Sequence, residues 1–271
     1  MKACGVVNED NLFPWKKGPA SESPLPAEVR QYLDQVVLPY YFKVFEQEED
    51  KEVIERTLEA LRELADSFGP AAFANCLPEV VKYIILLLEK KAYCQTNVMD
   101  GDEGEDLEDV EGDDDDDDEE EEEEDDGIDH DELILGNTTD LILWTARAMG
   151  NDFLPVFTQL APTLHGYTTD KHPKSDRHMA IGCMAEVFAS CPAAIPACFD
   201  DFVKLLDANS NLQDSKMNRN LAYAVGVLAQ HAQMLFQPHI ASFMTLLNRL
   251  NDNSSEQAAK DNVLAALCKI V

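Results

Sequence analysis

The side chains with the clearest chemistry are carboxylates gathered in one segment. Between Asp100 and Glu132 the chain has 25 acidic residues and no lysine or arginine, and the whole chain has a formal net charge of −32. A block of like charges repels itself and has nothing to bury, so segment 96–132 is predicted to be a disordered loop. Such a loop attracts cations and basic protein segments. The residues predicted to bind basic proteins are its unbroken run, Asp113, Asp114, Asp115, Asp116, Asp117, Asp118, Glu119, Glu120, Glu121, Glu122, Glu123, Glu124, Asp125 and Asp126.

This acidic run has a second interpretation, that of a solvating spacer between folded parts. A spacer rarely needs fourteen consecutive acidic residues, which favours a role in binding basic proteins. The same charge argues against nucleic acid as a direct ligand, because contacts to phosphate require lysine and arginine.

The remaining reactive side chains form no catalytic or metal-binding pattern. The seven cysteines are an odd number without a C-x-x-C pair, which predicts reduced core thiols in an intracellular protein. His172 and His178 have no cysteine or carboxylate at the spacing of metal ligands. Sequence motifs of phosphate-binding loops, serine hydrolases and zinc proteases are absent. We therefore predict no enzyme activity, no metal and no cofactor.

Hydrophobic patterning gives no sign of a membrane protein. The longest apolar run, Tyr83–Leu88, is far too short to cross a bilayer. The first ten residues lack the apolar core of a signal peptide. A soluble, intracellular protein is predicted.

Four polar residues recur at one position of a long repeat, at intervals of 41 or 42 residues. They are Asn137, His178, Asn220 and Asn262. Side chains repeated in this way predict a ladder of hydrogen bonds to the backbone of the neighbouring repeat, although direct contact with a ligand is an alternative. Buried polar groups need such partners.

The elements that carry these residues follow from a recurring proline. Pro39, Pro78, Pro155, Pro196 and Pro238 are 39, 77, 41 and 42 residues apart, and the long interval contains the acidic segment. A fixed period near 40 residues indicates a solenoid. Apolar residues recur 2, 6 and 9 positions after most of these prolines, on one face of a helix that the proline opens. A second apolar helical stripe precedes each proline.

Each repeat is therefore a pair of helices, A then B, and the fold is all-α. We predict an irregular segment 1–26, repeats over 27–95, the acidic loop 96–132 and repeats over 133–271. The expected helices are Ala27–Gln47 (B), Lys51–Phe68 and Ala71–Lys91, Leu133–Met149 and Asp152–Tyr167, Pro173–Ala189 and Pro192–Ala208, Gln213–Ala232 and Leu235–Leu250, and Ser254–Val271 (A). Polar residues of the B helices are expected to line the concave face. Its acidic members are predicted to contact lysine or arginine of a bound protein, with an ordinary solvated face as the alternative; they are Glu79, Asp200, Asp201 and Asp207.

The pattern as a whole resembles HEAT repeats of the importin-beta (karyopherin) superfamily. The resemblance covers 27–271 and is carried by the acidic insertion and by the starts of three A helices. Those starts read Asp-Arg at 176–177, Arg-Asn-Leu-Ala-Tyr-Ala-Val-Gly-Val-Leu at 219–228 and Asp-Asn-Val-Leu-Ala-Ala-Leu at 261–267. The chain is most similar to the C-terminal half of such receptors, and its unpaired first and last helices lead us to expect a fragment of a longer array.

The resemblance implies a nuclear transport receptor that works in the cytoplasm and the nucleus. It implies basic cargo such as core histones and ribosomal proteins, weak contacts with nucleoporins, and Ran GTPase bound mainly by N-terminal repeats that this chain lacks. Two alternatives stay open: a HEAT scaffold subunit of a phosphatase or chromosome complex, and a histone chaperone that acts through the acidic run.

Overall fold

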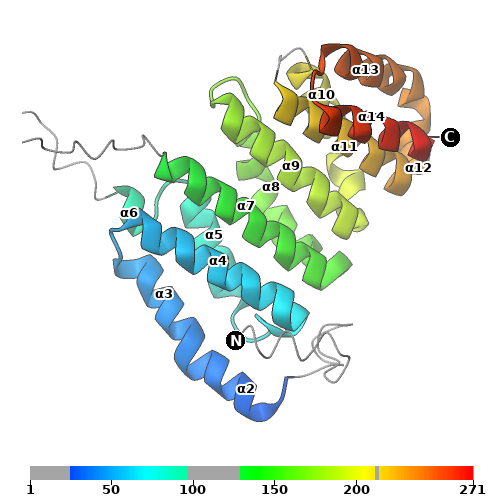
Figure 1. The fold of residues 1–271 in the computed structure, drawn as a ribbon. Helices are drawn as coiled ribbons and strands as arrows, with labels where there is room; N and C mark the ends of the chain where they lie inside the picture. The colour runs from blue at the N-terminus through cyan, green and yellow to red at the C-terminus, as the bar shows by residue number, and fades with distance from the viewer. Residues whose placement is uncertain (1–24, 97–128, 211–213, 271) are drawn as a thin grey trace, which may run out of the picture.

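The structure is a computed structural model, which describes residues 25–96, 129–210 and 214–270 (Figure 1). Within these ranges all regular structure is helical and no strand occurs. The helices stack in two layers along one direction, with A helices in one layer and B helices in the other (Figure 1). The predicted all-α HEAT-type solenoid is confirmed. The acidic run 113–126 lies outside the described residues.

The A and B layers are built from helices of similar length. The A helices are α4 (Lys51–Phe68), α7 (His130–Met149), α9 (Lys174–Ser190), α11 (Ser215–His231) and α14 (Gln257–Ile270). The B layer contains α2 (Ala27–Tyr32), a π turn (Leu33–Val37), α3 (Leu38–Gln47), α5 (Leu77–Leu88), α8 (Leu154–Tyr167), α10 (Ile195–Asn209) and α13 (Ile240–Asn253). Short elements complete the set: α6 (Tyr93–Thr96), α12 (Gln233–Phe236) and the 3-10 turns Gly69–Ala71, Gly150–Phe153, Pro192–Ala194 and Gln237–His239.

Most predicted helices have a close counterpart, but several ends differ by three residues or more. Helix α5 ends at Leu88 rather than Lys91, α10 begins at Ile195 rather than Pro192, α13 ends at Asn253 rather than Leu250, and α14 begins at Gln257 rather than Ser254. Helix α5 begins at Leu77 rather than Ala71, because residues 72–76 form turns after the 3-10 turn. Helix α7 begins at His130, three residues before the predicted start at Leu133, because the Asp129 carboxylate caps the backbone N–H groups of Asp131 and Glu132. Residues 233–239, expected in part within the last B helix, form α12 and a 3-10 turn instead.

The recurring prolines open the B helices as predicted. In α5, α8 and α10 the second residue is a proline, namely Pro78, Pro155 and Pro196. A missing N–H in the first turn leaves no helical hydrogen bond broken. Pro238 lies in the 3-10 turn before α13. Pro39 differs, because it follows the π turn within a continuous run of helix. The wider turn accommodates a proline ring that would otherwise clash with the preceding carbonyl.

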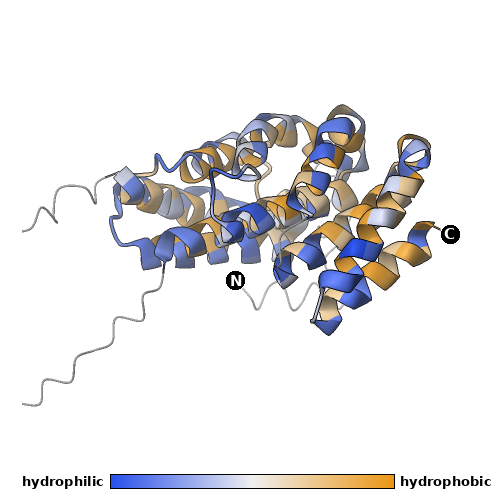
Figure 2. Ribbon diagram, turned by 90° about the horizontal axis from the view of Figure 1, so that it is seen from above, coloured by the Kyte–Doolittle hydropathy of each residue, from blue (hydrophilic) through white to orange (hydrophobic). Residues whose placement is uncertain are grey.

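One continuous core runs through the stack. Successive A helices pack against each other, in the order α4, α7, α9, α11 and α14. Apolar residues concentrate between the two layers and polar residues cover the outer faces (Figure 2). The Phe188 side chain is fully buried and contacts two neighbouring B helices, with its ring centroid 5.6 Å from that of Phe157 and 4.9 Å from that of Phe202. Each repeat therefore shares its core with its neighbours.

Two charged contacts join α4 to α7, the A helices that precede and follow the acidic segment in the chain. His130 Nδ1 lies 2.8 Å from Glu55 Oε1, and Lys51 Nζ lies 3.1 Å from Asp131 Oδ1. The Glu55 side chain is only 9% exposed, whereas that of His130 is 44% exposed. These contacts attach the first turn of α7 to α4.

The contact between His130 and Glu55 predicts a pH-dependent contribution to stability. The hydrogen bond to Glu55 raises the pKa of His130 above its ordinary value, against a smaller opposing effect of desolvation. A raised pKa means that the folded state binds the proton more tightly, so the contribution is fully present below about pH 6.5 and is lost as the pH rises through the folded pKa. Lys51 and Glu52 also act on this imidazole, with opposite signs.

Urea unfolding between pH 5.5 and 8.5 tests this expectation. The stability difference between the unchanged protein and His130→Ala should be larger at the acid end, and Glu55→Gln should remove the same pH dependence. A difference that is constant across this range would show that the pair contributes nothing through protonation.

Candidate functional site

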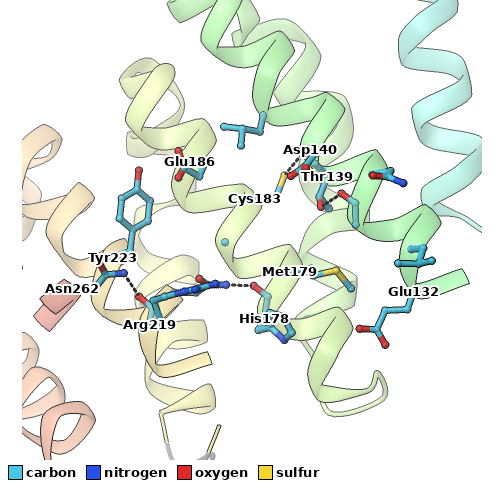
Figure 3. A pocket seen from close by; sticks show the side chains of 16 residues that line it. Glu132, Thr139, Asp140, His178, Met179, Cys183, Glu186, Arg219, Tyr223 and Asn262 are labelled. Carbon is cyan, nitrogen blue, oxygen red and sulfur yellow. Dashed lines mark hydrogen bonds between the residues drawn. The ribbon is translucent and has the colours of Figure 1, made fainter. Parts of the chain in front are cut away.

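Two of the four predicted ladder residues bond to the preceding A helix. Asn220 Nδ2 in α11 donates to the His178 carbonyl of α9 at 2.7 Å. Asn262 Nδ2 in α14 donates to the Arg219 carbonyl of α11 at 3.1 Å. Figure 3 shows both bonds crossing from one helix to the next. The geometry agrees with the expected ladder at these two positions, and its contribution to stability stays a prediction.

The other two ladder positions differ. The His178 ring turns back along its own helix, where Nδ1 lies 3.0 Å from the Lys174 carbonyl. The prediction that its side chain bonds to the neighbouring repeat is therefore wrong, and only its carbonyl takes part. The Asn137 side chain lines a groove beside the ladder and makes no bond to another helix within the described ranges.

Gly182 makes room for the Asn220 side chain. A Cβ atom at position 182 would lie 2.8 Å from Asn220 Nδ2, closer than real contacts allow. The amide therefore passes over the bare backbone of α9 to reach His178, one turn earlier. Sequence reasoning missed this glycine, although its place one helical turn after His178 was a usable signal.

The ladder borders a groove of about 580 Å³ on the surface of the A helices, which we call the A-helix groove (Figure 3). It is lined by Glu132, Leu133, Gly136, Asn137, Thr139, Asp140, Leu143, His178, Met179, Gly182, Cys183, Glu186, Arg219, Asn220, Tyr223 and Asn262. Its three carboxylates come from α7 and α9, and one of them, Glu186, pairs with Arg147 at 3.0 Å. The lining is thus polar and of mixed charge.

The protonation of the groove residues does not favour covalent chemistry. Burial raises the pKa of the Cys183 thiol, so the reactive thiolate is disfavoured. Burial also raises the pKa of Tyr223 to about 12, and the neighbouring Glu186 adds to this shift. Desolvation raises the pKa of Asp140 although its carboxylate reaches solvent, and it lowers the pKa of His178. The groove offers hydrogen bonds and contact area rather than a nucleophile with its base.

No group of three or more histidine, cysteine or acidic residues in the described ranges could hold a metal ion. No single described helix is long and apolar enough to cross a membrane, although α9 and Pro192–Asn209, bent by 113°, pass that test as a pair.

The four acidic residues predicted on the concave face all lie on B helices and are exposed. Glu79 is in the first turn of α5, whereas Asp200, Asp201 and Asp207 are on α10. Helix α8 lies between these two helices (Figure 1), so Glu79 does not join the other three. Lys204 Nζ lies 2.9 Å from Asp201 Oδ1, and this hydrogen-bonded pair lowers the pKa of the Asp201 carboxyl. Cargo contact by these residues stays a prediction.

A second ladder, which sequence reasoning missed, joins the ends of the B helices. Tyr167 Oη donates to the Leu88 carbonyl at 2.5 Å, and Asn209 Nδ2 donates to the Thr168 carbonyl at 3.3 Å. Arg249 Nη1 donates to Ser210 Oγ at 2.6 Å. The three donors differ in residue type, so no repeated letter in the sequence marks them. Only their spacing, measured from the helix ends, would have indicated a ladder.

Comparison with known proteins adds a family signal to this architecture. The family described as Importin repeat 6 matches residues 102–170, a stretch that includes the acidic run and the helix pair α7 and α8. The chain is 26% identical to Importin-4 of Homo sapiens over 87% of its own length. The predicted resemblance to the importin-beta superfamily is confirmed. Importin-4 of Mus musculus is 25% identical over 93% of this chain, and Probable importin subunit beta-4 of Schizosaccharomyces pombe is 23% identical over 96%.

The matches to the importin relatives cover only part of each relative. The aligned region makes up 20%, 22% and 23% of these three relatives, so the chain spans about a fifth of their length. The fold is also similar to that of an engineered protein of known crystal structure, with a TM-score of 0.57 and 16% identity over 99% of this chain and 90% of the other. That likeness supports the helical architecture alone.

Proposed function

We propose that this chain is a segment of a nuclear transport receptor that binds basic protein cargo. One observation carries the proposal: the acidic run lies inside the region that matches an importin repeat. Of the formal net charge of −32, the stretch between Asp100 and Glu132 supplies −25. A surface with this charge suits proteins rich in lysine and arginine, and core histones and ribosomal proteins have that chemistry.

The ends of the acidic segment support a role for it at one edge of the solenoid. On one side the described chain reaches Thr96 at the end of α6, which packs against α3 and α4. On the other side it resumes at Asp129, directly before the contact between His130 and Glu55. Helices α4 and α7 pack together, so the described residues before and after the acidic segment belong to neighbouring elements. The negative charge is therefore part of an internal segment and not of a chain end.

The mechanism we propose is electrostatic capture by many interchangeable contacts. A strong negative field attracts basic segments and raises their association rate by about 10- to 1,000-fold, and salt weakens the effect. The screening length is about 8 Å at physiological ionic strength, so capture acts mainly at short range. The exposed carboxylates of α10 would extend the same field along the B layer.

Partners and location follow from the transport proposal. Nucleoporins would contact the receptor in transit between cytoplasm and nucleus, and Ran GTPase would act mainly through repeats outside this chain. We expect neither enzyme activity nor direct binding of nucleic acid from this chain.

Deletion of Gly112–Gly127 tests the electrostatic mechanism. The association rate with a core histone dimer at low salt should fall by about ten-fold or more, because steering is lost. The dependence of that rate on salt should flatten, while helicity and melting temperature stay unchanged. Stopped-flow fluorescence of labelled histone measures the rates.

A matched control replaces the same residues with an uncharged Gly/Ser segment of equal length. It should behave like the deletion, because only the charge differs from the unchanged protein. If the neutral variant captures histone at the original rate, the acidic run is a spacer and the proposed mechanism is wrong.

A further inference from the structure

A second groove, of about 600 Å³, lies where α8 ends and meets α9 and α10. We call it the B-end groove. It is lined by His165, Thr168, Thr169, Asp170, Arg177, Asp201, Lys204, Leu205, Ala208 and Asn209. Apart from Asp201, none of these residues belongs to the predicted sites, and the groove shares no lining residue with the A-helix groove.

The B-end groove contains a buried hydrogen-bond acceptor without a partner. Asn209 is only 3% exposed. Its Nδ2 is fully used, because it donates to the Leu205 carbonyl at 3.0 Å and to the Thr168 carbonyl at 3.3 Å. Its Oδ1 is buried and accepts no hydrogen bond from the residues that the structure describes. The two bonds from Nδ2 fix the orientation of the amide, so Oδ1 cannot turn to find a donor within its own helix.

The same groove contains a buried donor without a partner. Arg177 Nε is removed from solvent and donates to none of the described residues. In the described part of the chain the Arg177 guanidinium also forms no ion pair. An unsatisfied buried donor or acceptor costs about 1–3 kcal/mol, and such groups are uncommon in native proteins. Two of them in one open groove point to a ligand that supplies an acceptor to Arg177 and a donor to Asn209.

The charge of the groove limits the chemistry of that ligand. Two cations, Arg177 and Lys204, face two carboxylates, Asp170 and Asp201. Lys204 and Asp201 already pair at 2.9 Å, so the lining is close to neutral. A phosphate would meet both carboxylates, and a strongly basic side chain would meet the Arg177 guanidinium. A neutral polar group that both donates and accepts fits best.

We propose that the B-end groove binds the main chain of an extended peptide segment from a partner protein. A peptide carbonyl would accept from Arg177 Nε–H, and a peptide N–H would donate to Asn209 Oδ1. An extended chain presents such groups about every 3.3 Å and on both edges, so one segment can satisfy both residues. The apolar side of the groove, Leu205 and Ala208, would contact its side chains. This inference goes beyond the proposed function, because it concerns main-chain groups and not basic side chains.

The test uses a neutral peptide as the probe. Because this peptide carries no charge, the acidic run does not attract it. The probe is an acetylated and amidated heptapeptide of alternating Thr and Ser, whose β-branched residues favour an extended backbone. Methyl NMR of the full chain follows Thr168, Thr169, Leu205 and Ala208 during titration with millimolar peptide. We expect saturable shifts at these methyl groups. The same heptapeptide N-methylated at every residue should bind about ten-fold more weakly, because it has no main-chain N–H group for Asn209.

Two protein variants complete the test. Arg177→Met keeps the apolar stem but removes the donor, and it should weaken binding by about ten-fold. Arg219→Met, in the A-helix groove, is the matched control and should leave the affinity unchanged. Equal binding of the N-methylated peptide, unchanged affinity of Arg177→Met, or the absence of shifts at the four groove residues would each overturn the inference. Because the N-methylated peptide is tested on the unchanged protein, poor folding of a variant does not prevent a decision. None of these outcomes depends on capture of histones by the acidic run.

Discussion

Replacement of Phe188 by alanine is expected to lower the free energy of unfolding by about 3–5 kcal/mol, as is usual for a fully buried phenylalanine. The ring lies between Phe157 of α8 and Phe202 of α10, with edge-to-face geometry at centroid distances of 5.6 and 4.9 Å. Its removal leaves a cavity where three helices meet and takes away two aromatic contacts. Because repeats touch only their neighbours, the loss falls on the junction between two repeats.

Thermal and urea unfolding, followed by circular dichroism, measure the effect of Phe188→Ala. A melting temperature lower by about 10 °C corresponds to this change in stability for a chain of this size. Tyr40→Ala is the matched control: its side chain is 65% exposed, and a surface change of this kind should stay within about 0.5 kcal/mol. If Phe188→Ala were no more destabilising than Tyr40→Ala, the packing of α9 against its neighbours would differ from the structure.

Features that depend on a repeated residue were predictable from the sequence. Pro78, Pro155 and Pro196 indicated three B helices, because proline is tolerated in the first turn and disfavoured later. The register of Asn220 and Asn262 indicated bonds between repeats, because equal spacing gives equal position in a solenoid. His178 occupies the same register and behaves differently. Register fixes the place of a residue, whereas the direction of its side chain depends on local contacts such as the bond to Lys174.

Features that depend on contact between unlike residues were not predictable. The path of the Asn220 amide requires Gly182 on another helix, and no single position in the sequence reveals that pair. Likewise Arg177 and Asn209 are 32 positions apart and meet only because α9 and α10 fold around one groove. The start of α5 was misplaced since residues 72–76 are as apolar as the helix they precede, and hydrophobicity alone does not separate a turn from a helix.

Two glycines on the stacked A helices are expected to respond very differently to substitution. A Cβ atom at Gly182 would meet the end of the flexible Asn220 side chain, whereas one at Gly226 would lie 3.2 Å from Ala266 Cα, part of the backbone of α14. The Asn220 amide can turn away, so Gly182→Ala should lose one hydrogen bond and gain helix propensity, with a net change within about 1 kcal/mol. At position 226 the neighbour is backbone, which cannot turn away, so helix α14 must move as a whole to make room for a valine. Gly226→Val should therefore lower the free energy of unfolding by about 2–3 kcal/mol.

A double-mutant cycle then shows whether the ladder stabilises the stack. Alone, Asn220→Ala should destabilise the protein by about 1 kcal/mol through the lost bond to the His178 carbonyl. In the Gly182→Ala background the bond is already broken, so the same change should cost almost nothing, and the two substitutions should show a coupling energy of about 1 kcal/mol. Gly226→Val is the distant control, because its contact is with α14, and it should combine additively with Gly182→Ala. Additivity of Asn220→Ala with Gly182→Ala would mean that the 2.7 Å bond contributes nothing to stability. The alignment of α9 and α11 would then rest on their other contacts, such as that between Glu186 and Tyr223.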